Sequence, residues 1–79
     1  MEHWALTQVR QIEEQIKVNQ EHLDKLKAKA AGVDDHYRIG RVEAILTELK
    51  VDVGIYRRIY KRDMEREARR VAIEKGGAA

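Results

Sequence analysis

The sequence predicts an all-α protein: an antiparallel hairpin of two long, coiled-coil-like helices that assembles into a helical bundle. Three observations support this prediction. The 79-residue chain contains no proline and is rich in Ala, Leu, Glu, Lys and Arg, which favour helix. Apolar residues recur at alternating spacings of three and four, as in coiled coils. One glycine-containing segment separates two such stretches, so we treat residues 1–79 as a single helical-hairpin domain.

The first helix is predicted over residues 3–31, where one apolar stripe runs the whole length. The members of the stripe are Ala5, Val9, Ile12, Ile16, Asn19, Leu23, Leu26 and Ala30. Asn19 is the one polar member. A buried amide accepts few pairings, so Asn19 either selects register and oligomeric state or lies at the edge of the stripe. The sequence leaves both interpretations open.

Residues 32–35 are predicted to form the loop, because connections of this length join antiparallel helices. Gly32 is expected to end the first helix in the left-handed conformation that glycine adopts without steric cost. Asp34 or Asp35 is expected to cap the second helix by accepting a backbone hydrogen bond. The side chains of these aspartates and of His36 could also bind a metal ion. Capping already accounts for the aspartates, so we predict no metal site.

The second helix is predicted over residues 35–74, followed by a frayed tail at residues 75–79. Its main stripe comprises Ile39, Val42, Leu46, Leu49, Val53, Tyr56 and Tyr60, and continues as Met64, Ala68 and Val71. This helix is longer than the first, so its end is expected to project from near residue 63, with Trp4 close to Tyr60 or Met64.

Glycines inside the second helix allow two interpretations. They break the helix, or they belong to a second face made of Gly40, Ala44, Thr47, Val51 and Gly54. No turn residues flank Gly54, which favours a continuous helix. Ile45, Ile55 and Ile59 add apolar surface to the same helix, and the first helix is too small to bury all of it. This excess predicts a homo-oligomer or a complex with partner helices.

The predicted function is that of a non-enzymatic, self-associating interaction or adaptor protein that acts through coiled-coil packing. The predicted interface joins both main stripes to the second face. Its residues are Val9, Ile12, Ile16, Asn19, Leu23, Leu26, Ile39, Gly40, Val42, Ala44, Leu46, Thr47, Leu49, Val51, Val53, Gly54, Ile55, Tyr56, Ile59 and Tyr60. An enzyme is not expected, because the chain has no Cys or Ser and no catalytic motif. No cofactor or small-molecule substrate is expected either.

Charge is distributed unevenly along the chain. Residues 57–79 carry eight Lys or Arg and four Asp or Glu, whereas residues 1–35 carry five and seven. The candidate phosphate-binding residues are Arg57, Arg58, Lys61, Arg62, Arg66, Arg69 and Arg70. Tyr56 and Tyr60 lie among them and are candidates for stacking on bases. The alternative function is therefore a small nucleic-acid-binding regulator or packaging accessory protein that uses the basic end of the second helix.

The sequence also bears on location. The start of the chain lacks a basic segment followed by an apolar run, as a secretory signal has. No apolar stretch approaches the roughly 20 residues that span a bilayer. We therefore expect a soluble cytoplasmic protein without a membrane span.

Overall fold

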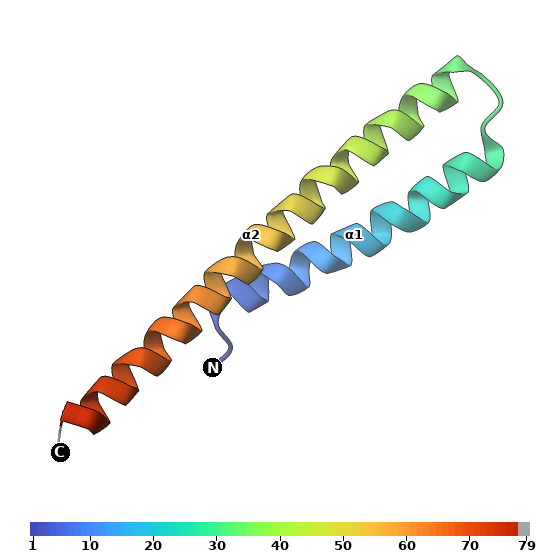
Figure 1. The fold of residues 1–79 in the computed structure, drawn as a ribbon. Helices are drawn as coiled ribbons and strands as arrows, with labels where there is room; N and C mark the ends of the chain where they lie inside the picture. The colour runs from blue at the N-terminus through green and yellow to red at the C-terminus, as the bar shows by residue number, and fades with distance from the viewer. Residues whose placement is uncertain (78–79) are drawn as a thin grey trace.

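Two helices of unequal length make up the structure. The computed structural model describes residues 1–77, with α1 at Trp4–Lys29 and α2 at Val33–Gly77. The helices pair antiparallel over the length of α1, and α2 then continues alone (Figure 1). The whole molecule is a rod of 71 × 19 × 14 Å. The predicted all-α helical hairpin is confirmed.

The apolar stripes of the two helices meet and form a core in two clusters. The cluster nearer the loop comprises Leu23, Ile39, Val42 and Leu46. The cluster nearer the chain start comprises Val9, Ile12 and Val53. Ile16 packs against both clusters and makes the core continuous. Spacings of three and four residues keep each stripe on one side of its helix, so the two stripes can face each other. Burial of this apolar surface holds the helices together.

The loop differs from the prediction. The helix α1 ends at Lys29, and Ala30 is extended, with φ −60° and ψ 123°. The prediction of a left-handed Gly32 was wrong, because no residue in the described part of the chain has positive φ. Gly32 instead precedes α2, and its carbonyl accepts a hydrogen bond from the His36 amide at 3.1 Å. Residues 30–32 thus form the connection, one residue shorter than predicted.

The aspartates after the loop lie inside the first turn of α2 rather than before it. Asp35 Oδ2 accepts a hydrogen bond from the Ala31 amide at 3.1 Å. Both carboxylates also sit where the positive end of the helix dipole favours negative charge. The prediction that Asp34 or Asp35 caps α2 was wrong, because both lie within its first turn and the Ala31 amide that Asp35 binds precedes the helix. The helix α2 begins two residues earlier than expected.

Neither glycine in the middle of α2 interrupts it. The helix runs unbroken from Val33 to Gly77 through Gly40 and Gly54. A methyl group added at Gly40 would meet no atom within 4 Å, so this side of the helix is open. The end of α2 also differs from the prediction, because residues 75–77 of the expected tail are helical. Residues 78 and 79 lie outside the described residues.

Candidate functional site

Most of the predicted interface residues pack between the two helices of one chain. Between α1 and α2 lie Val9, Ile12, Ile16, Leu23, Leu26, Ile39, Val42, Leu46, Leu49, Val53 and Tyr56. Their side chains pack against the other helix of the hairpin, so none presents a free apolar stripe to a second protein. Within this set, only the remaining residues are open to a partner.

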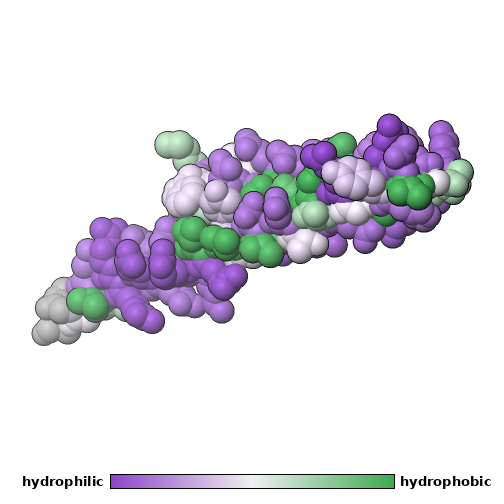
Figure 2. Space-filling view, turned by 90° about the horizontal axis from the view of Figure 1, so that it is seen from above, coloured by the Kyte–Doolittle hydropathy of each residue, from purple (hydrophilic) through white to green (hydrophobic). Residues whose placement is uncertain are grey.

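Of the nine remaining residues, all but Asn19 and Tyr60 form a surface on α2 outside its core contacts with α1, which we call the outer face. It comprises Gly40, Ala44, Thr47, Val51, Gly54, Ile55 and Ile59. Five of these residues are exposed, and Gly54 and Ile59 are half-buried. Thr47 lies at the edge of this face and lines a hollow that α1 shares. Val51 keeps 55% of its surface in contact with solvent, although valine is usually buried. Figure 2 shows apolar patches on the paired part of the hairpin and a mainly hydrophilic projecting end.

Asn19 lies at the edge of the α1 stripe. Its side-chain Nδ2 donates to the Gln15 carbonyl of its own helix at 2.8 Å. The side chain is half-buried, and its only hydrogen bond among the described residues stays within α1. This geometry favours the edge interpretation over a role in selecting the register.

The seven candidate phosphate-binding residues separate into groups. Arg62, Arg66 and Arg69 line one shallow hollow together with Glu65. Arg58 lies one turn before them and donates from Nε to the Gly54 carbonyl at 3.2 Å. Lys61 is exposed on a neighbouring side of α2. Two further arginines are paired with carboxylates: Arg57 Nη2 lies 2.7 Å from Glu13 of α1, and Arg70 Nη2 lies 2.5 Å from Glu67.

The two tyrosines predicted to stack on bases contact the start of the chain instead. Tyr60 meets the ring of His3 edge-on, with ring centroids 5.3 Å apart. Tyr56 meets the ring of Trp4 edge-on at 6.0 Å. His3 and Trp4 in turn stack on each other at 5.7 Å. Both tyrosines are half-buried in this aromatic cluster, which lies at the open end of the hairpin.

His3 was not singled out by the sequence, yet it connects both helices. Its Nδ1 accepts a hydrogen bond from the Ala5 amide at 3.0 Å and so caps the start of α1. An accepting Nδ1 carries no proton, which places the proton of the neutral ring on Nε2. Nε2 therefore donates to Asp63 Oδ2, 3.0 Å away. One imidazole thus caps α1 and ties it to α2 at the point where α2 begins to project.

We expect His3→Ala to lower the free energy of unfolding by about 1 to 2 kcal/mol, because it removes a helix cap and a link to α2. Urea unfolding followed by circular dichroism measures this loss. His22→Ala is the matched control, since His22 is exposed on α1 and makes no side-chain hydrogen bond with any residue in the described part. Equal stabilities of the two variants would show that the His3 contacts contribute nothing.

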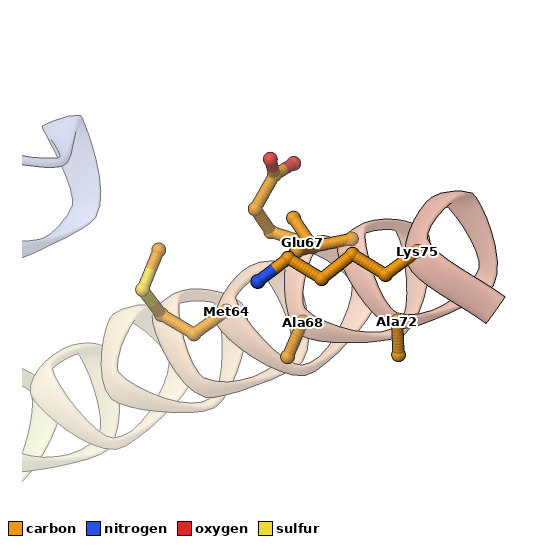
Figure 3. Close-up of a pocket in the computed structure, with 6 residues that line it drawn as sticks. Met64, Glu67, Ala68, Ala72 and Lys75 are labelled. Carbon is orange, nitrogen blue, oxygen red and sulfur yellow. The ribbon is translucent and has the colours of Figure 1, made fainter. Parts of the chain in front are cut away.

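Beyond the aromatic cluster, the main stripe of α2 continues without a covering helix. Met64, Glu67, Ala68, Ala72 and Lys75 line a shallow hollow there together with Val71 (Figure 3). Lys75 and Glu67 place charges beside the small apolar side chains. The hollow is therefore open and lined mainly by apolar surface, with these two charges beside it.

Metal binding and membrane spanning find no support in the described residues. No three His, Asp or Glu side chains within them gather in a way that could hold a metal ion. Neither helix contains, over its described length, a segment long and apolar enough to cross a membrane. Comparison with known proteins adds no information about function: no family model, curated protein or solved structure matches the chain.

Proposed function

We propose that the protein is a non-enzymatic interaction protein that self-associates through the outer face of α2. The observation that carries this proposal is the exposure of a continuous apolar and small-residue surface on the helix that already uses its other side for the core. Exposed large apolar residues on it include Val51 and Ile55. Contiguous apolar patches of this kind on a small protein mark interaction sites.

A second copy of this chain is the partner that the outer face fits, because the face is complementary to itself. Its first half is small, with Gly40, Ala44 and Thr47, and its second half carries Val51, Ile55 and Ile59. Antiparallel pairing of two copies lays the large half of one against the small half of the other. Facing large and small side chains interdigitate and fill space, and the open position at Gly40 accommodates a close approach.

Charge favours the same orientation. The exposed arginines at residues 58, 62, 66 and 69 follow the outer face toward the end of α2. Parallel pairing would place the arginines of two copies alongside each other, and like charges at an interface repel. Antiparallel pairing sends them to opposite ends of the assembly. The proposed unit is therefore an antiparallel pair of hairpins with the two copies of α2 in contact.

Substitution of Val51 by glutamate tests the proposal. A charge at this position would lie unpaired inside the interface, so we expect Val51→Glu to weaken association by about a hundredfold or more. Val18→Glu is a close control, because Val18 on α1 is also 55% exposed and lies outside the outer face. Sedimentation equilibrium over a range of concentrations measures the mass of all three proteins.

The expected result is a dimer or larger assembly for the unsubstituted protein and for Val18→Glu, and a monomer for Val51→Glu. A protein that stays monomeric throughout the concentration range would refute self-association. Equal weakening by the two glutamates would place the interface elsewhere than on the outer face.

A further inference from the structure

Four arginines form a regular line on α2, which we call the arginine row: Arg58, Arg62, Arg66 and Arg69. All four side chains are exposed. They recur about once per helical turn, so neighbouring members are about 5 to 6 Å apart along the axis. The last two lie beyond Asp63, which is level with His3 at the start of α1. Figure 1 shows this part of α2 projecting past α1, open on all sides.

Three of the four carboxylates near the arginine row are committed elsewhere. Asp63 faces His3, and Glu67 pairs with Arg70. Glu13, the acid that α1 directs toward this region, pairs with Arg57. Glu65 alone lines the same hollow as three members of the row. Over residues 1–77, Arg62, Arg66 and Arg69 form no ion pair, and with Glu65 as the one carboxylate among them the row carries a net positive charge.

The choice of arginine over lysine points to an anion with several oxygens. The basic residues of α1 are four lysines and Arg10, whereas residues 57–70 contain six arginines and Lys61. Either side chain keeps a helix solvated. Arginine differs in presenting a planar fork of donors that binds phosphate oxygens in pairs. A straight line of such forks suits a chain of phosphates better than one small anion.

We propose that the arginine row binds the phosphate backbone of nucleic acid without preference for base sequence. Sequence-independent binding is expected because the nearby aromatic side chains, Tyr56 and Tyr60, are held by Trp4 and His3 on another side of the helix. A membrane surface fits less well, because no Trp, Phe or Leu follows residue 49 to anchor in lipid.

This binding goes beyond self-association and uses different residues. In the antiparallel pair proposed above, with Ile55 of one copy opposite Ala44 of the other, Arg69 reaches past the start of α2 in the second copy. Arg58, Arg62 and Arg66 lie beside residues 33–41 of the second copy in this pair, so the whole row is open only in the single hairpin.

The test is the salt dependence of binding to a short, fluorescently labelled DNA duplex of mixed sequence, measured by anisotropy. Four phosphate contacts predict that log K falls with log salt with a slope of about −3 to −4. Between about 50 and 200 mM salt the affinity should therefore fall by about a hundredfold. The triple variant Arg62→Gln, Arg66→Gln, Arg69→Gln should reduce the slope to about −1.

A control variant removes the same charge from the opposite end of the rod. It is Lys25→Gln, Lys27→Gln, Lys29→Gln, whose lysines are exposed near the loop. Glutamine is a good helix former, so neither variant should lose helix, and circular dichroism checks this. The control should keep the slope of the unsubstituted protein, and a second duplex of unrelated sequence should bind with equal affinity.

Three results would overturn the proposal. The first is the absence of duplex binding at about 50 mM salt. The second is an equal reduction of the slope in both triple variants, which would indicate total charge rather than the row. The third comes from vesicles of phosphatidylcholine and phosphatidylserine: loss of vesicle binding in the arginine variant, with no DNA binding by the unsubstituted protein, would assign the row to a membrane.

Discussion

Leu46→Ala is expected to remove a large share of the stability of the protein. Leu46 is 4% exposed and belongs to the core cluster with Leu23, Ile39 and Val42. Truncating a buried leucine costs about 2 to 5 kcal/mol through lost burial and the cavity that remains. A chain of this length has a total stability on the order of 4 to 12 kcal/mol. One substitution can therefore remove most of it.

The small size of the core is the reason for this sensitivity. Eight residues are buried, and no side chain in the described part is less than 2% exposed except the small Ala5. Two helices in contact along one line cannot surround a side chain, so few others can compensate for the loss of Leu46. Thermal unfolding should shift downward by roughly 10 to 30 °C for a domain of this length.

Ile45→Ala is the matched control for Leu46→Ala. Ile45 is the preceding residue and is 41% exposed, so its truncation removes the same number of carbon atoms from a site that forms no core contact. We expect a loss of less than about 1 kcal/mol there. Both variants are compared at one protein concentration, since association raises apparent stability. Equal losses at the two positions would mean that the core does not lie between α1 and α2.

The pairing of the helices was predictable because it depends on a pattern that extends over many residues. The stripe from Val9 to Leu26 and the stripe from Ile39 to Tyr56 each place apolar residues on one side of a helix. A short connection makes the two helices antiparallel neighbours, and an antiparallel hairpin buries both stripes against each other. The same pattern sets the approximate register, and with it the prediction that α2 projects near residue 63.

Helix ends were less predictable, because each depends on a few local interactions. Gly32 has the residue type of a helix end, but the chain leaves α1 earlier, at Ala30. Asp35 then accepts a hydrogen bond from the Ala31 amide, and α2 begins earlier than predicted. At the far end, Gly76 does not stop the helix. A glycine disfavours helix by about 1 kcal/mol, which is too little to fix a boundary by itself.

The aromatic cluster could not be derived from the sequence. Trp4 was expected near Tyr60 or Met64, and the structure places it one turn earlier, against Tyr56. His3 takes the place beside Tyr60. Histidine is not among the preferred capping residues, and Asp63 lies 60 residues away along the chain. These side chains meet only at one register of α1 against α2. The spacing of the apolar residues predicts that register only approximately, so it does not predict these contacts.

Asn19→Leu is expected to raise the free energy of unfolding by about 1 to 2 kcal/mol. Asn19 lies on α1 between Ile16 and Leu23, which both contribute to the core. Leucine favours helix more than asparagine and would extend the apolar stripe across this position. Loss of the amide leaves no group without a partner, because the Gln15 carbonyl that it bonds still accepts a hydrogen bond within the helix.

The mass distribution distinguishes the two interpretations of Asn19. The melting temperature should rise by roughly 5 to 15 °C, and light scattering should give the same mass as for the unsubstituted protein. Asn19→Ala is the control, since it improves helix propensity without adding apolar contact, and it should give about half of the gain. If Asn19 instead selected the register of an assembly, leucine would allow additional registers and broaden the masses. The bond of Asn19 to its own helix is the physical reason to expect a single, unchanged mass.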